Sequence, residues 1–240
     1  MPKLVAGNWK MNGLKGEGLA LARDLAVRAK SAKLPCEVAL CPPATLLISV
    51  AEAIKGSGLA LGAQDCAAQS SGAFTGDVSA AMLKDAGCRY VIVGHSERRQ
   101  LHGEGDALVR AKAAAAVQAG LVPIVCVGET EKERQEGQTE AVVTRQLKAS
   151  LPPGLGGDGV VIAYEPVWAI GSGKTPSASE VASVHALIHA AAARARVLYG
   201  GSVKPANAEE LMGVPGVDGA LVGGASLVAA DFWAVVQACG

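Results

Sequence analysis

The chain has 240 residues, half of them hydrophobic and only 3% aromatic, with 22 basic and 22 acidic residues and a formal net charge of +0. A neutral chain has no overall field that would draw it to nucleic acid or to an anionic membrane, so any anion must be bound by a local arrangement. A core of Ala, Val, Leu and Ile suits parallel strands that are buried on both faces and covered by helices.

The N-terminal residues lack the long apolar run of a signal peptide, and no stretch approaches the length of a membrane span. The six cysteines form no C-x-x-C pair and show no metal-ligand spacing. These features predict a cytoplasmic protein with reduced thiols that binds neither metal nor membrane.

Eight short apolar runs alternate with Ala-rich segments of helical periodicity, one of which opens with a Ser177–Glu180 capping box. Repeated strand–helix units at this length predict an α/β fold: a closed parallel (β/α)8 barrel ringed by helices, in one domain over residues 1–240. An open doubly wound sheet is the alternative. The predicted strands are residues 4–6, 38–40, 59–61, 90–93, 122–127, 160–164, 197–199 and 220–222.

Three further features have ordinary structural interpretations. The polar stretch 129–140 is predicted to be a solvated helical surface. The glycine-rich stretch 154–159 is predicted to be a flexible turn before a strand, because no helix follows it to complete a phosphate site. The remaining histidines are assigned to the surface or to helix packing: His102, His185 and His189.

Polar or glycine-rich turns follow five of the predicted strands, where the active site of a parallel barrel forms. Each has an ordinary explanation alone: a lysine is a surface charge, a histidine a structural imidazole, a glutamate an ion-pair partner, and a glycine pair a tight turn. The five turns are residues 7–12 with Lys10, 94–99 with His95, 165–176 with Glu165, 200–203, and 223–226.

A barrel would bring these five turns to one mouth. The glycine turns after the last two strands would let backbone N–H groups approach a phosphate, aided by a helix N-terminus. The carboxylate and the histidine would supply a base and an electrophile. Because the chain has no G-x-G-x-x-G motif and no metal-ligand set, cofactor-free proton transfer beside a carbonyl is the simplest chemistry.

The same turns resemble the signature segments of the triosephosphate isomerases, in order along nearly the whole chain. The resemblance implies a (β/α)8 homodimer that interconverts dihydroxyacetone phosphate and D-glyceraldehyde 3-phosphate through an enediolate, in glycolysis and gluconeogenesis. The segments that carry the resemblance are 7–10 (GNWK), 93–99 (VGHSERR), 164–171 (YEPVWAIG), 199–203 (YGGSV) and 221–224 (LVGG).

The resemblance also assigns roles to the site residues. Glu165 is the base that carries the proton, and neutral His95 polarises the carbonyl and stabilises the enediolate. Lys10 supplies positive charge and Asn8 orients the same oxygens, with Glu97 and Ser96 supporting them. The backbone N–H groups that hold the phosphate belong to Gly171, Ser202, Gly223 and Gly224.

A mobile lid is implied next, because an enediolate phosphate exposed to water eliminates its phosphate. Tyr199 and Ser202 are expected to hydrogen-bond the closed lid. Two departures from the family stand out: the helix from about Ala178 reaches Val197 with almost no connection, and Pro176 follows the lid directly and restricts its end. The lid comprises Pro166, Val167, Trp168, Ala169, Ile170, Gly171, Ser172, Gly173, Lys174 and Thr175.

A long segment without predicted structure, residues 64–79, carries one of the two phenylalanines of the chain at its tip. Loops of this length are usually functional or disordered. In the family, the matching loop inserts into the neighbouring subunit. Phe74 and Thr75 are therefore expected to dock beside Asn8, Lys10 and Glu97 of the other subunit in a two-fold dimer.

Two other functions fit part of this pattern. Another barrel isomerase or lyase for a different phosphosugar would share the phosphate turns but would need a longer pocket. A non-catalytic phosphate-binding barrel would be expected to lose the base. The combination of His95, Glu165 and the lid segment favours the triose phosphate isomerase.

Overall fold

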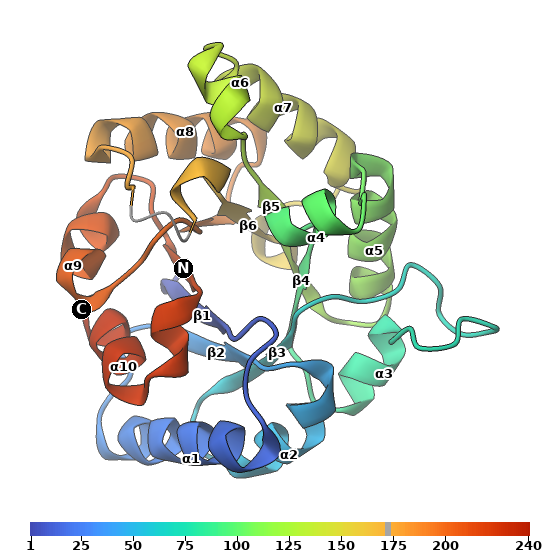
Figure 1. Ribbon diagram of the computed structural model, residues 1–240, viewed down its shortest axis with the longest axis vertical. Coiled ribbons are helices and arrows are strands. Elements are labelled where there is room, and N and C mark those ends of the chain that lie inside the picture. Colours follow the sequence, from blue (N-terminus) through green and yellow to red (C-terminus); the bar gives the residue numbers. More distant parts are fainter. Residues whose placement is uncertain (171–173) are drawn as a thin grey trace.

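A computed structural model describes residues 1–170 and 174–240. Its eight parallel strands pair in chain order and close into a barrel, with the helices around it (Figure 1). Closure between the first and last strands confirms the (β/α)8 prediction and excludes the open sheet. The strands are β1 (Leu4–Asn8), β2 (Glu37–Cys41), β3 (Ala60–Ala63), β4 (Tyr90–Val93), β5 (Val122–Val127), β6 (Val161–Tyr164), β7 (Arg196–Tyr199) and β8 (Gly219–Val222).

The helical layer consists mostly of short amphipathic helices that turn apolar stripes toward the barrel. The predicted capping box is confirmed: the Glu180 N–H donates to the Ser177 hydroxyl at 3.3 Å, and the Ser177 N–H donates to the Glu180 carboxylate at 2.7 Å. The helices are α1 (Lys15–Ser31), α2 (Leu47–Ala53), α3 (Ala80–Asp85), α4 (Ser96–Leu101), α5 (Asp106–Gln118), α6 (Glu131–Gln135), α7 (Thr139–Ser150), α8 (Ala178–Ala191), α9 (Pro205–Gly213) and α10 (Ala229–Gln237), and the 3₁₀ turns are η1 (Ala44–Leu46), η2 (Gly157–Gly159), η3 (Val167–Ala169) and η4 (Gly224–Leu227).

The strand alternation determines which side chains fill the barrel. Leu4 and Ala6 of β1, Ala163 of β6 and Leu198 of β7 belong to the inner core, while the residues between them pack against the helices. Successive side chains point to opposite faces, so inward-facing positions are two residues apart. On several strands, the next inward-facing position beyond the apolar core is a polar residue at an end of the barrel. These residues are Asn8 and Glu165 at the carboxyl ends of the strands, and Arg196 and Glu37 at the amino ends.

Two predicted boundaries need correction. Strand β1 extends to Asn8, which pairs with Cys41, so this asparagine ends the strand instead of belonging to the following turn. The connection from α8 to β7 is not nearly absent: the helix ends at Ala191, and four residues, 192–195, make the turn. In this turn Arg194 adopts a left-handed backbone conformation with φ of 65°. This conformation allows the chain to reverse its direction within four residues.

None of the helices in the described ranges is both long and apolar enough to cross a bilayer. The stretch 154–159 leads into β6 through the 3₁₀ turn η2, as the sequence predicted.

Candidate active site

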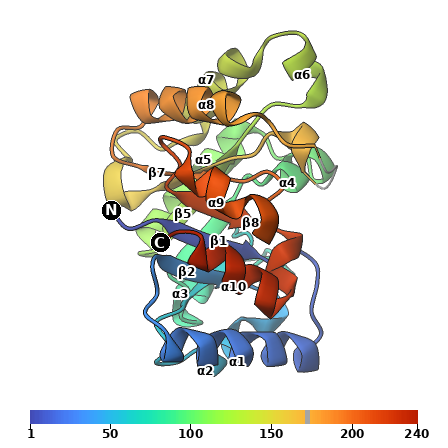
Figure 2. The same ribbon diagram turned by 90° about the vertical axis from the view of Figure 1, so that its left-hand side faces the viewer.

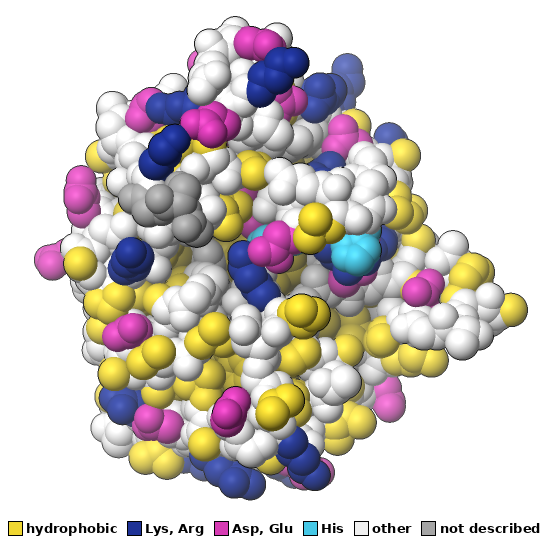
Figure 3. Space-filling view, viewed as in Figure 1, with side chains coloured by type: hydrophobic (Ala, Val, Ile, Leu, Met, Phe, Trp, Pro, Cys, Tyr) yellow, Lys and Arg dark blue, Asp and Glu magenta, His cyan; other side chains and the backbone are white. Residues whose placement is uncertain are grey.

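A cavity of about 220 Å³ lies at the carboxyl ends of the strands. Figure 3 looks onto this end, where basic and acidic side chains lie next to each other near the centre. The cavity brings together residues from five strand ends. The predicted site residues that line it are Asn8, Lys10, His95, Glu165, Ser202, Gly223 and Gly224, and the others are Ile170, Gly200, Gly201, Val203, Lys204, Leu221 and Ala225.

The two central groups are in direct contact. His95 Nε2 lies 2.9 Å from Glu165 Oε1, and the Ser96 N–H donates to Glu165 Oε2 at 2.9 Å. His95 is the N-cap of α4, where its Nδ1 accepts the Glu97 N–H at 3.2 Å. An Nδ1 that accepts a hydrogen bond carries no proton, so this geometry favours a neutral ring with its single proton at Nε2.

Burial and charge act in opposite directions on this pair. Burial disfavours the Glu165 carboxylate, but His95, the Ser96 N–H and Lys10 outweigh it and hold the pKa of Glu165 below its ordinary value. Burial also acts to lower the pKa of His95, while the Glu165 carboxylate raises it above its ordinary value. The Glu165 carboxylate thus favours the protonated ring, whereas the Glu97 N–H that donates to Nδ1 favours the neutral ring. We assign the neutral form, because an Nδ1 that accepts this hydrogen bond carries no proton.

Lys10 occupies a strained position beside the pair. Its backbone has φ of 54°, a region that costs a non-glycine residue of order 1 kcal/mol or more. Its N–H donates to Asn8 Oδ1 at 3.1 Å, its carbonyl accepts from Gln64 Nε2 at 2.8 Å, and its ammonium lies 2.5 Å from Glu97 Oε1. These contacts hold the Lys10 ammonium at the wall of the cavity. The sequence analysis missed Gln64, because no local pattern indicates that it reaches β1.

Two glycines leave room for Glu165, one beside its backbone and one beside its side chain. A Cβ on Gly128 would lie 1.7 Å from the Glu165 carbonyl oxygen, and one on Gly200 would lie 2.9 Å from Glu165 Cγ. The sequence analysis named the glycine pair after β7 only as part of a turn and did not consider Gly128. Its place directly after β5 was the available signal.

Comparison with known proteins agrees with this geometry. The model of the family described as "Triosephosphate isomerase" matches residues 3–239. The chain is 54% identical to the triosephosphate isomerase of Afipia carboxidovorans and 56% identical to that of Rhodopseudomonas palustris, in both cases over 98% of this chain and 97% of the relative. The chain belongs to the triosephosphate isomerase family. It is similar to the crystal structure of the Bartonella henselae triosephosphate isomerase with a TM-score of 0.91 and 46% identity over 99% of each chain.

In this triosephosphate isomerase family member, the segment predicted to be a lid is described on both sides of residues 171–173, and Gly171, Ser172 and Gly173 lie outside the described residues. Trp168 in η3 donates from its indole to Glu129 at 2.8 Å, and Tyr164 donates to the same carboxylate at 3.2 Å. Glu129 is fully buried, so the prediction of a solvated surface from residue 129 is wrong at its first position. Burial raises the pKa of Glu129.

Other contacts hold the lid segment on its outer side. The Arg134 guanidinium lies 3.9 Å from the centre of the Trp168 ring, and Lys174 pairs with Glu131 at 2.8 Å. The Tyr199 hydroxyl is buried and has no hydrogen-bond partner within the described ranges. An unpaired buried hydroxyl is costly, so this group can gain stability from an additional hydrogen-bond partner.

Proposed function

We propose that this chain interconverts dihydroxyacetone phosphate and D-glyceraldehyde 3-phosphate through an enediolate, without a cofactor. The observation that carries the proposal is the 2.9 Å contact between His95 Nε2 and Glu165 Oε1 on a cavity whose other wall contains Ser202, Gly223 and Gly224. A base and a hydrogen-bond donor thus face a glycine-rich turn across a space suited to a small phosphorylated substrate.

In the proposed reaction, Glu165 removes a proton from one carbon of the substrate and returns it to the neighbouring carbon. The carbonyl oxygen gains negative charge meanwhile, and it is stabilised by the Nε2–H of neutral His95 and by the Lys10 ammonium. Glu165 must first release the Ser96 N–H and His95. Since these two groups hold its pKa low, their loss makes the carboxylate a stronger base when the substrate is bound.

The phosphate is proposed to bind the backbone N–H groups of Gly171, Ser202, Gly223 and Gly224. Ser202 follows β7, and Gly223 and Gly224 follow β8 at the start of η4. Lys204, which the sequence analysis did not single out, lines the same cavity and adds a positive charge. A local site of this kind is what a chain without net charge requires for binding a dianion.

We propose that residues 166–175 close over the bound substrate. The contacts of Trp168 with Glu129 and of Lys174 with Glu131 support two anchored ends. The unpaired Tyr199 hydroxyl and Ser202 are the proposed partners of the closed segment. Closure would protect the enediolate from water and limit elimination of phosphate.

The test of the activity is a coupled assay of the purified protein with each triose phosphate, with and without a metal chelator. We expect turnover in both directions at the same rate in either buffer. No turnover of either substrate, or a rate that the chelator lowers, would reject the proposal. Six cysteines that are free thiols also suit the reducing cytoplasm, which we propose as its compartment.

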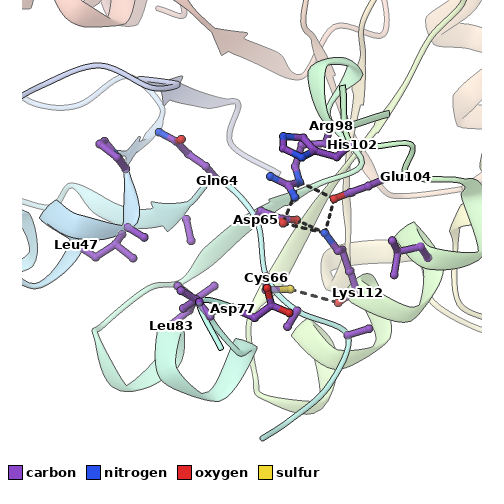
Figure 4. Close-up of a pocket in the computed structure, with 18 of the residues that line it drawn as sticks. Leu47, Gln64, Asp65, Cys66, Asp77, Leu83, Arg98, His102, Glu104 and Lys112 are labelled. Atoms are coloured by element: carbon purple, nitrogen blue, oxygen red, sulfur yellow. Dashed lines mark hydrogen bonds and ion pairs between the residues drawn. The ribbon is translucent and has the colours of Figure 1, made fainter. Parts of the chain in front are cut away.

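We also propose that the chain forms a two-fold dimer through the loop between β3 and α3. This loop extends away from the barrel in Figure 1, and Phe74 at its tip is 44% exposed. A pocket of about 530 Å³ lies at the base of the loop (Figure 4), and it is lined in part by Met11, which is 96% exposed, and by Leu108. Exposed apolar side chains beside an open pocket favour a protein contact.

The charged floor of this pocket is rigid. Lys112, itself buried, pairs with Asp65 at 2.8 Å and with Glu104 at 2.6 Å, and Arg98 pairs with Glu104 at 2.6 Å (Figure 4). The lining also includes Lys10 and Gln64, so an inserted loop would reach the group that holds Lys10. The proposed occupant is the Phe74–Thr75 tip of a second copy, which would support Lys10, Asn8 and Glu97 across the interface.

The dimer is tested with Thr75→Arg, and Thr144→Arg on the exposed side of α7 is the matched control. We expect Thr75→Arg to sediment as a monomer at micromolar concentration and to lose most of its kcat, while the control remains an active dimer. A monomeric wild-type protein, or a fully active Thr75→Arg dimer, would overturn this part of the proposal.

A further inference from the structure

We propose that Cys36 and Cys239 form a reversible disulfide when the protein meets a small disulfide oxidant, and that this bond fastens α10 to the start of β2. Cys36 directly precedes β2, and Cys239 lies two residues beyond the end of α10. Figure 2 shows the C-terminal end of the chain on the same side of the molecule as the N-terminal end.

The two cysteines share one carbonyl group. The Cys36 thiol donates to the Val236 carbonyl oxygen at 3.9 Å, and the Cys239 backbone N–H donates to the same oxygen at 3.2 Å. The neighbouring residues are also close, because a Cβ built on Gly240 would lie 3.6 Å from Pro35 Cβ. Both segments therefore meet at the Val236 carbonyl, with the two cysteines on either side of it. Disulfide formation therefore needs little movement of either segment.

The two sulfurs have different environments. Cys36 is 6% exposed, whereas Cys239 is only half-buried and so more accessible to a reagent. The neighbouring Cys36 thiol lowers the pKa of Cys239 and the nearby Lys3 ammonium lowers it further, while burial opposes both; Cys239 in turn raises the pKa of Cys36. Cys239 is thus the nucleophile, and Cys36 is the thiol that resolves the intermediate.

The other four cysteines lack this combination. Cys41, Cys66, Cys88 and Cys126 are at most 2% exposed. Burial raises the pKa of Cys66 and of Cys88 to about 12, and it raises the pKa of Cys41 and Cys126 as well. A buried thiol with a raised pKa is a poor nucleophile, so oxidation should be confined to the Cys36–Cys239 pair.

The chemistry balances as two exchange steps. The Cys239 thiolate attacks one sulfur of the oxidant, the S–S bond of the oxidant breaks, and one small thiol leaves as its thiolate and takes up a proton. Cys36 then gives up its proton and attacks the Cys239 sulfur, which displaces the second small thiol. Two protein thiols lose two electrons in total, and one small disulfide is reduced to two thiols.

The bond would connect segments that lie far apart in the sequence. Helix α10 packs against α1, β1 and η4, and η4 begins with Gly224 of the proposed phosphate site. A cross-link that closes a loop of about two hundred residues restricts the unfolded chain strongly. The oxidised protein should therefore resist unfolding, while its active site at the opposite end of the strands should keep its kcat.

The experiment treats the native full chain with oxidised glutathione, alkylates the remaining thiols, and measures the intact mass and the linked peptides. We expect a Cys36–Cys239 peptide with no glutathione retained, and alkylation at the other four cysteines. The melting temperature should rise by about 5 °C or more and return to its starting value with dithiothreitol.

Three variants assign the roles of the two sulfurs. Cys36→Ser and Cys36→Ala should each stop at a stable glutathione adduct on Cys239, and Cys239→Ser should not react. A wild-type protein that keeps all six thiols, or that links a different pair, overturns the proposal. A Cys36–Cys239 disulfide that leaves the melting temperature unchanged overturns the fastening role.

Discussion

The two ends of the barrel both bury charged side chains, but they use them differently. At the amino ends of the strands, Arg196 donates to Glu37 at 2.7 Å and to the Tyr90 hydroxyl at 2.9 Å, and Arg89 pairs with Glu37 at 2.6 Å. This cluster gathers two guanidinium groups around one carboxylate at the closed end of the barrel. At the carboxyl ends, Glu165 contacts His95 and the Ser96 N–H beside a cavity of about 220 Å³. In the proposed reaction, only this second arrangement exchanges its partners for a substrate.

Backbone strain shows the same contrast. Lys10 at the mouth and Arg194 in the turn before β7 are the non-glycine residues with positive φ in the described ranges, at 54° and 65°. The strain at Lys10 places a charge at the cavity wall, whereas that at Arg194 only allows a short turn. A buried charge or a strained backbone therefore indicates function only when an open, polar cavity adjoins it.

Glu165→Gln should have the largest effect. The variant removes the proposed base but keeps the size of the side chain, so kcat should fall by about 10²–10⁴, while a substrate analogue still binds. The matched control is Glu37→Gln at the other end, which should keep kcat within about twofold and lose stability. A near wild-type kcat in Glu165→Gln would contradict a catalytic role for the charged groups at the carboxyl ends of the strands.

Arg196→Met should reveal the structural role of the amino end. It leaves the buried Glu37 carboxylate with Arg89 as its remaining cationic partner, so the free energy of unfolding should fall by about 3 kcal/mol. Denaturant unfolding at a fixed protein concentration measures this change. Isomerase activity of the folded variant should be unchanged, and a parallel loss of kcat would mean that this cluster also serves the site.

As the pH falls, protonation of His185 in α8 should lower the stability of the protein before protonation of Glu165 lowers its activity. His185 is buried, contacts the Gly216 carbonyl and the ring of Tyr164, and burial lowers its pKa to about 4, while the unfolded chain has an ordinary histidine. Between about pH 6.5 and 4 the unfolded state binds a proton that the folded state does not. Stability is therefore lost as pH falls through this window, by about 2.5 kcal/mol at pH 4.5.

This acid sensitivity is measured from unfolding curves between pH 7 and pH 4.5. His185→Gln should flatten the dependence, because it removes the buried imidazole. The pKa of Glu165 in the free protein lies below its ordinary value, so its protonation should lower kcat/KM only at a more acidic pH. An unchanged slope in His185→Gln would place the acid-sensitive group elsewhere.

Arg194→Gly should have the smallest effect, and it should be favourable. Glycine adopts positive φ without strain, so the free energy of unfolding should rise by about 0.5–1 kcal/mol with unchanged kcat. Lys10→Gly relieves the same kind of strain at the mouth but removes the charge, and it should lose activity. Equal behaviour of the two variants would contradict a functional role for the strain at Lys10.

The sequence alone determined the strands and their order. The β-branched runs predicted all eight strands, with β4 and β5 at their observed bounds, because a strand buried on both faces leaves a local apolar signature. The polar turns after these runs indicated Lys10, His95 and Glu165, since a closed barrel must bring its strand ends together. The family motifs added the expected roles.

Contacts between distant segments were decided only by the tertiary structure. The burial of Glu129 against Trp168 and the reach of Gln64 to Lys10 leave no local pattern. The pairing of Arg196 with Glu37 depends on barrel closure, which brings residues 159 positions apart to 2.7 Å. A polar residue's burial and partners follow from strand register and helix packing, and these become fixed only when the whole barrel closes.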